Sequence, residues 1–348
     1  MSGISAVSRF DAWGGTIGMA ISVWVTLGAV NRVMADRTAL GGCLIRAFLL
    51  SSTLGAIYGL TVFGRYLAGC GGLPRAELPF VGCNTAGTVF AVAMVVALGC
   101  VGFARRWEKI ALIIMIPVMG AALGATQSRG ALVALGVGLA VLFVTTLRPH
   151  SGKAFILALV GLIVVFVTCV HVYPPLSARY ASIGNLSANS DRLEIWRTAI
   201  HMMKDHPIFG VGVNNFHEIY LRYPHPEERS HEVMSTAHNI FMEFGASTGI
   251  PGLVLLLVVI AFGIANGVKA CRSSPTRRAL RQAPGKCIRL ADEGAAGQAH
   301  GVPGVVLAAF ATLLAHLQFD LTVYSGDMLP LFFIVYGVLT YLGERMPD

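Results

Sequence analysis

Long apolar stretches dominate the chain and alternate with shorter polar ones. Runs of about 20 apolar residues can cross the hydrocarbon core of a bilayer as helices, and the chain contains about nine of them. They cover residues 12–34, 43–64, 84–104, 110–128, 130–147, 154–173, 250–268, 303–322 and 327–343. The pattern therefore predicts an all-α polytopic membrane protein with about nine transmembrane helices.

A long polar segment interrupts this pattern between the sixth and seventh runs. It extends over residues 174–248 and is rich in His, Arg, Glu and Asn. Apolar residues recur at helical spacing over residues 191–203, which predicts an amphipathic helix on the membrane surface. The His-Pro pair at 206–207 would end that helix. Gly210 and Gly212 would then allow a tight turn before a second short helix.

The apolar and polar segments divide the chain into three parts. Residues 1–173 would form about six spans, and residues 174–248 a large loop that holds the working site. Residues 249–348 would form the last spans. Their linker, 269–302, is rich in Pro, Gly, Ala and Arg and has little apolar periodicity, so we interpret it as a flexible cytoplasmic segment.

Composition agrees with a membrane protein and sets its orientation. The chain is 55% hydrophobic and 13% charged, and its net charge is +8. In a soluble protein this charge would suggest nucleic acid, but here the basic residues lie in loops between spans, so no nucleic-acid partner is expected. The positive-inside bias places these loops in the cytoplasm and the large loop outside. The loops placed in the cytoplasm contain Arg32 and Arg37, Arg105, Arg106 and Lys109, Arg148 and Lys153, and the basic residues between 269 and 289.

Cysteine and histidine spacing gives no sign of a metal or cofactor. The seven cysteines include no CxxC pair. Prolines break any regular ligand spacing in the His-rich and Glu-rich stretch at 223–232. Cys70 and Cys83 bracket one short loop and could form a disulfide if that loop faces an oxidising compartment. We therefore expect no metal and no cofactor.

One histidine stands where the polar segment re-enters the membrane. His238 and Asn239 precede a short helical stretch and then Gly249 and Gly252. An imidazole can accept a proton from a sugar hydroxyl near neutral pH, which makes His238 a candidate base. The alternative is a hydrogen-bonded histidine at the membrane interface without a catalytic role.

Several arginines lie at the outer ends of predicted spans or in the large loop. They are Arg65, Arg129, Arg192 and Arg197. Guanidinium groups bind phosphate oxygens bidentately, so a cluster of them suggests a pyrophosphate ligand presented from the lipid. For Arg129, at the junction of two apolar runs, snorkelling to the lipid headgroups is the other interpretation.

Three motifs resemble the O-antigen ligase and polymerase superfamily of bacterial envelope glycosyltransferases. The ligase motif is His, then Asn, Ser or Gln, then nine residues and Gly-x-x-Gly, and it fits without a gap. The matching residues are His238, Asn239, Gly249 and Gly252 for this motif, Arg192, Trp196, His206, Pro207, Gly210 and Gly212 for the second, and Thr126, Ser128, Arg129 and Gly130 for the third. The resemblance covers about residues 80 to 345.

The resemblance implies a reaction at the periplasmic face of a bacterial inner membrane. A glycan would move from undecaprenyl pyrophosphate to lipid A core, with inversion and without a metal ion. His238 would activate the acceptor hydroxyl and Asn239 would orient the imidazole. Arg129 and Arg192 would hold the pyrophosphate, and topology adds Arg65 and Arg197 to this cluster. The alternatives are a polymerase of the same superfamily, with a glycan acceptor, and a lipid-linked glycan flippase.

The predicted span count differs from the family pattern. Members of this superfamily have about a dozen spans, so the chain's nine would lack N-terminal ones. Residues 1–11 have no basic region joined to a short apolar core, so no cleavable signal peptide is expected.

Overall fold

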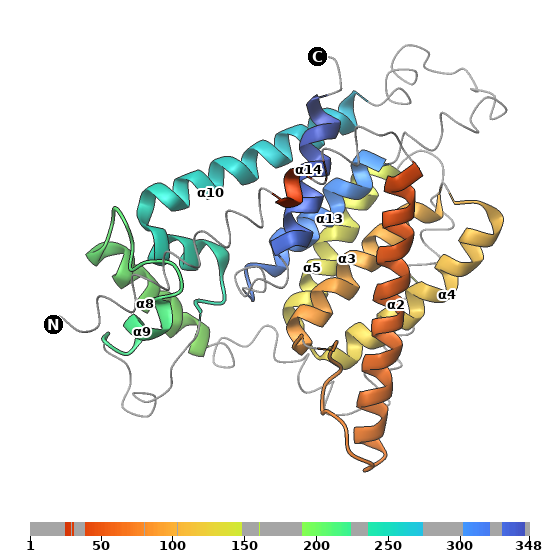
Figure 1. The fold of residues 1–348 in the computed structure, drawn as a ribbon, viewed down its shortest axis with the longest axis horizontal. Coiled ribbons are helices and arrows are strands. Elements are labelled where there is room, and N and C mark those ends of the chain that lie inside the picture. The colour runs from red at the N-terminus through yellow and green to blue at the C-terminus, as the bar shows by residue number, and fades with distance from the viewer. Residues whose placement is uncertain are drawn as a thin grey trace. The chain divides into compact units, whose positions relative to one another are not determined.

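The computed structural model describes ten stretches of the chain, and the regular structure in them is helical apart from one isolated bridge between Leu78 and Val81 (Figure 1). The described residues are 25–28, 30, 39–79, 81–102, 104–147, 160, 190–223, 236–273, 302–320 and 329–344. The elements are α2 (Ala39–Leu67), α3 (Cys83–Val101), α4 (Arg106–Thr126), α5 (Arg129–Leu142) with the π-helical turn η1 (Phe143–Leu147), α8 (Ser190–Asp205), α9 (Phe216–Tyr220), α10 (Ile240–Arg272), α13 (Val302–His316) and α14 (Leu329–Glu344).

Five described helices are long and apolar enough to cross a membrane. They are α2 from Gly42, α3, α4, α5 extended to Thr146, and α10. They correspond to the predicted spans 43–64, 84–104, 110–128, 130–147 and 250–268. The predicted spans 303–322 and 327–343 correspond to the shorter apolar helices α13 and α14. The spans predicted at 12–34 and 154–173 lie largely outside the described residues.

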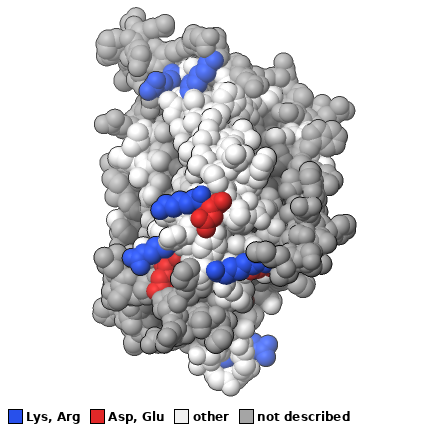
Figure 2. Space-filling view, turned by 90° about the vertical axis from the view of Figure 1, so that its left-hand side faces the viewer, with Lys and Arg blue, Asp and Glu red and all other residues white. Residues whose placement is uncertain are grey.

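These helices make the described chain an all-α, multi-pass membrane protein. On the face seen in Figure 2, uncharged residues make up most of the described surface, and the few Lys and Arg side chains lie partly beside Asp and Glu side chains and partly apart from them. The space-filling view agrees with the composition, because a bilayer favours an uncharged surface.

The described residues form two compact units, and unit 2 is the apolar helical bundle. It takes its residues from Ala29–Tyr180, Gly263–His316 and Ile334–Asp348. α3 lies at its centre and is buried along most of its length, with α4, α5 and α13 packed against it.

Small residues allow these helices to approach closely. A Cβ on Gly138 of α5 would collide with Thr312 of α13. A Cβ on Gly99 of α3 would collide with Val305, which also belongs to α13. Such crossings are typical of membrane bundles, in which packing between helices replaces the hydrophobic effect.

Unit 1 contains the polar segment and the helix that follows it. Its residues come from Met1–Gly28, Ala181–Phe262 and Leu317–Phe333. It therefore includes α8, α9 and α10 as far as Phe262. The buried side chains are Ile195, Ala199 and Met202 of α8, Phe216 and Tyr220 of α9, Ala246 of α10, and Ala237. The amphipathic helix predicted at 191–203 is α8, and its apolar face forms this core.

Candidate functional site

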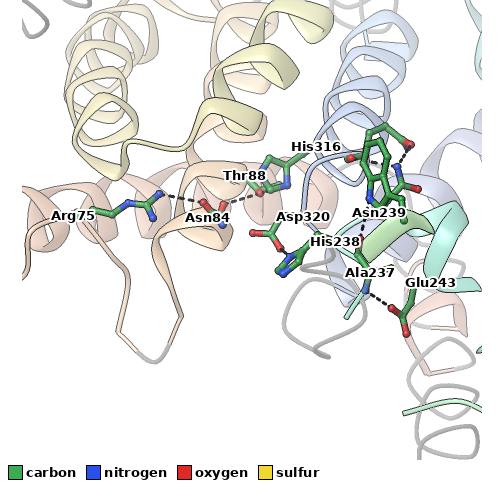
Figure 3. A network of polar contacts seen from close by, with 11 residues as sticks. Arg75, Asn84, Thr88, Ala237, His238, Asn239, Glu243, His316 and Asp320 are labelled. Carbon is green, nitrogen blue, oxygen red and sulfur yellow. Dashed lines mark hydrogen bonds and ion pairs between the residues drawn. The ribbon is translucent and has the colours of Figure 1, made fainter. Parts of the chain in front are cut away.

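His238 lies in the short stretch that joins the polar segment to α10. Its backbone has φ +51°, in the left-handed region. Its Nδ1 lies 3.2 Å from Oδ1 of Asp320 (Figure 3). The His238 side chain is 32% exposed and that of Asp320 is 15% exposed. Because a carboxylate only accepts hydrogen bonds, the pair favours the tautomer with the proton on Nδ1, which leaves Nε2 as an acceptor.

Ala237, the residue before His238, is held at both of its backbone groups. Its N–H donates to Oε2 of Glu243 at 2.7 Å (Figure 3). Its carbonyl accepts from the indole Nε1 of Trp196 at 3.1 Å. Glu243 is fully buried, and its other oxygen accepts from the Ser247 hydroxyl at 3.0 Å. The backbone that leads into His238 is therefore fixed by one side chain from α8 and one from α10.

Asn239, the residue after His238, caps the start of α10. Its Oδ1 accepts from the backbone N–H groups of Phe241 at 2.9 Å and Met242 at 3.2 Å. Its Nδ2 donates to the carbonyl and the side-chain oxygen of Gln318, both at 3.3 Å. We expected Asn239 to orient the imidazole. These contacts use it as a helix cap, and the group bonded to the imidazole is Asp320.

The glycines of two motifs bring the turn after α8 against α10. Val211 N–H donates to Ala246 O at 2.8 Å, and Gly212 N–H donates to Ser247 O at 3.0 Å. Gly210 and Gly249 have φ +64° and +75°. A Cβ on Gly249 would lie 2.5 Å from Ile208 O, so only glycine permits this approach.

α10 is kinked at the same place. Gly249 is the residue with non-helical backbone angles inside α10, and Pro251 follows it. The N–H of Ile250 donates to Pro207 O at 2.8 Å, so the 206–212 turn accepts a backbone donor at the kink. Gly252 lies against the side chain of Thr248, one turn before it in the helix. The kink is therefore held by the chain segment that follows α8.

α8 places its two predicted arginines differently. Arg192 is partly buried and stands one turn before Trp196 on the same face, the face whose indole reaches the carbonyl before His238. Arg197 is exposed and stands on another face. Of the two, Arg192 is thus on the side of α8 that carries the contact to the His238 stretch.

Tyr223 ties the end of α8 to the chain after α9. Its hydroxyl donates to Oδ2 of Asp205 at 2.9 Å. Burial, together with the bond to the Asp205 carboxylate and its charge, raises the pKa of Tyr223 to about 12. The phenol therefore stays protonated at neutral pH and remains a donor.

Arg129 and Arg65 belong to unit 2. Arg129 is the first residue of α5, and the N-cap before it, Ser128, accepts from the N–H of Ala131 at 3.4 Å. Arg129 is partly buried there. A cation at a helix N-terminus is repelled by the positive end of the helix dipole. An anion bound there would therefore be stabilised both by the guanidinium and by the helix dipole. Arg65 is exposed in the last turn of α2 and donates to Cys70 O at 3.4 Å.

The turn that carries Arg129 is fastened to the loop between α2 and α3. Arg75 Nε donates to Thr126 O at 2.7 Å, and Gln127 Nε2 donates to Pro74 O at 2.8 Å. Arg75 also reaches Asn84, whose carbonyl accepts from Thr88 (Figure 3). Thr88 in turn lies 2.9 Å from Nδ1 of the buried His316. These contacts fix the Arg129 turn within unit 2. Cys70 and Cys83, which bracket the loop, are free thiols.

Asp320 and Glu243 are site residues that sequence reasoning missed. Each carries a carboxylate within or beside an apolar run, and such positions are costly unless the charge has a partner. That signal could have pointed to both of them. Asp320 is 82 residues from His238, so no local spacing links the two. Among the described residues, no three His, Cys, Asp or Glu side chains are grouped as metal ligands would be.

One comparison with known proteins finds a similar family. The family model described as O-antigen ligase matches residues 110–257. This range begins in α4 and ends in α10, so it contains Arg129, Arg192, His238 and the Gly249 kink. No curated protein matches the chain, and no solved structure matches it. Residues 110–257 of the chain are therefore similar to the O-antigen ligase superfamily, whose members are glycosyltransferase-like ligases or polymerases, and this similarity supports membership in it.

Proposed function

We propose that the protein is an O-antigen ligase-like glycosyltransferase. It transfers a glycan from undecaprenyl pyrophosphate to lipid A core at the periplasmic face of a bacterial inner membrane, with inversion and without a metal ion. The observation that carries the proposal is the His238–Asp320 pair, in which a partly exposed imidazole is bonded to a carboxylate. The O-antigen ligase match over residues 110–257, which include His238, supports it.

His238 is the general base of this reaction. With the Nδ1 proton directed at Asp320, Nε2 accepts the proton of the acceptor hydroxyl. Asp320 orients the ring and stabilises the imidazolium that forms. Asn239 supports the base indirectly, since it caps the helix that begins two residues after His238.

The transfer exchanges one bond at the anomeric carbon for another. The acceptor oxygen bonds to this carbon from the side opposite the phosphate, and the bond from the carbon to the pyrophosphate oxygen breaks. The proton goes to His238, and the electron pair leaves with undecaprenyl pyrophosphate. Arg192, which is in the same unit as His238, neutralises the charge that develops on the leaving group. The resemblance gives Arg129 the same role, and Arg65 and Arg197 are the further cations that the predicted topology suggests.

A genetic test compares histidines of one unit. A strain that lacks the gene is complemented with the wild type, His238→Ala, Asp320→Asn or His217→Ala, and its lipopolysaccharide is analysed on gels. His217 is an exposed residue of α9 and serves as the control. Loss of the base lowers transfer by about 10²- to 10⁴-fold, so His238→Ala should yield uncapped core. Asp320→Asn keeps the shape but loses the charge, and should retain intermediate activity.

The deletion strain also separates the alternative functions. Loss of all capped core indicates a ligase, whereas core capped by a single repeat indicates a polymerase that uses the same base. If the glycan pattern is unchanged while the His238→Ala protein is folded and inserted in the membrane, the transferase mechanism is wrong. This outcome would favour a flippase instead.

A further inference from the structure

Two large apolar side chains stand out from the polar part of unit 1. They are Ile208, which is 62% exposed, and Phe209, which is 85% exposed. Both lie in the 206–212 turn, directly after the exposed residues Lys204, Asp205 and His206. Leaving a side chain of this size in water forgoes about 1.5–3 kcal/mol relative to burying it. An apolar pair at this exposure calls for a partner.

The turn presents this pair on a rigid support. Three backbone hydrogen bonds join the turn to α10, from Val211 and Gly212 to α10 carbonyls and from Ile250 to Pro207. The glycines Gly210 and Gly249 let the two backbones meet. The position of Ile208 and Phe209 relative to the kink of α10 is therefore fixed by backbone contacts.

The same kink marks the start of the long apolar part of α10. From Ile250 onward the helix exposes one large apolar side chain after another, including Val254, Leu255 and Val258, each more than half exposed. α10 is one of the helices able to cross a membrane. Its exposed apolar side chains are therefore those that face acyl chains.

Continuity between these two surfaces identifies the occupant. The carbonyl of Pro207 accepts a hydrogen bond from the N–H of Ile250, the first residue after the kink. Ile208 and Phe209 directly follow Pro207, so this apolar pair lies next to the start of the apolar surface of α10. The polar residues just before the tip, including Lys204, suit a headgroup layer, because a lysine stem can lie along apolar surface while its ammonium stays in water.

We propose that Ile208 and Phe209 insert into the acyl-chain region of the bilayer, next to the outer end of α10, and anchor unit 1 to the membrane. The nine residues from Ile240 to Thr248 rise by about 14 Å along α10, so the anchor also fixes the level of His238 relative to the lipid. The proposal does not depend on the chemistry at His238.

Photocrosslinking tests the anchor directly. A benzophenone amino acid replaces Phe209, or His217 as control, in the full chain reconstituted into vesicles of phosphatidylethanolamine and phosphatidylglycerol. His217 lies on α9 of the same unit and its side chain is 48% exposed. After irradiation, mass spectrometry should find several-fold more lipid adducts at position 209 than at 217. Equal yields, or crosslinks from 209 to a second copy of the chain, would overturn the proposal.

A second measurement avoids the bulky crosslinker. Phe209→Trp and His217→Trp proteins are reconstituted in the same lipids with brominated acyl chains, and the emission of the unsubstituted protein is subtracted. Bromine quenches indoles that it contacts, so the added fluorescence at 209 should fall markedly and that at 217 should stay. Fluorescence at 209 that falls no more than that at 217 would contradict the proposal.

Discussion

At the scale of single residues, the conformation of His238 needs support from its neighbours. A residue other than glycine in the left-handed region costs about 1–2 kcal/mol, although histidine tolerates that region better than most. Trp196 and Glu243 hold the peptide before it, and Asn239 caps the helix after it. Each such hydrogen bond contributes about 1 kcal/mol, so together they offset the strain and leave the ring in one place.

Glu243 is the buried residue whose loss should best reveal this support. Glu243→Ala leaves the Ala237 N–H and the Ser247 hydroxyl without their acceptor, which should lower the free energy of unfolding by about 1–3 kcal/mol. Glu243→Gln keeps one acceptor oxygen and should cost less. Ser247→Ala, as control, removes a single donor. Thermal unfolding of the purified proteins measures these differences.

Activity distinguishes positioning from stability alone. If Glu243 positions His238, the alanine variant should lose kcat at a temperature where it is still folded, with little change in KM for the lipid-linked donor. Glu243→Gln should recover much of that rate. A Glu243→Ala protein with wild-type kcat would show that the His238 stretch holds its geometry without this carboxylate.

At the scale of elements, two motifs far apart in the sequence form one structural feature. The His-Pro-x-x-Gly-x-Gly segment and the Gly-x-x-Gly segment bond to each other through their backbones at the α10 kink. Their glycines are explained by positive φ at Gly210 and Gly249 and by the close approach of the two backbones. The motif residues between the helices therefore shape the support of the site.

Gly249→Ala tests this account of the kink. The new Cβ would meet the carbonyl groups of Pro207 and Ile208 in a backbone conformation that alanine disfavours, so we expect a loss of at least about 2 kcal/mol in stability. Gly136→Ala is the control, because that glycine lies inside α5 with nothing within 4 Å of a new Cβ. It should be neutral, or stabilising by up to about 1 kcal/mol. Equal melting temperatures for the two variants would contradict the close-approach argument.

Local patterns predicted the elements well and their pairing poorly. Helical spacing indicated residues 191–203, and α8 runs from Ser190 to Asp205, because amphipathic periodicity is a property of the helix itself. The bonds between the 206–212 turn and α10 join backbone atoms, which leave no side-chain pattern beyond the glycines. The role of Asp320 was not predicted for a related reason. Its contact with His238 is tertiary, and the chain between the two residues includes a whole candidate membrane helix.

At the scale of the whole molecule, the distribution of charge predicts which side of the membrane each part faces. α10 connects the polar segment, which contains His238, to a stretch with basic residues from Lys269 to Arg289. The part of α10 after the kink has 23 residues, from Ile250 to Arg272, and is about 35 Å long, enough to cross a core of about 30 Å. We therefore propose that the two stretches lie on opposite sides, with the basic one in the cytoplasm.

Reporter fusions on either side of α10 test this orientation. Alkaline phosphatase, which is active only outside the cytoplasm, should be active when fused after Tyr223 and inactive when fused after Ser273. Green fluorescent protein should fluoresce at 273 and stay dark at 223, because it folds in the cytoplasm. This expectation follows from the cost of placing the charges of Lys269 and Arg272 in the low-dielectric core of the bilayer. Their long side chains can reach only the interface at the C-terminal end of α10. The reverse pattern would put His238 in the cytoplasm and rule out transfer on the periplasmic side, whereas activity of both reporters at one site would mean that α10 does not span the membrane.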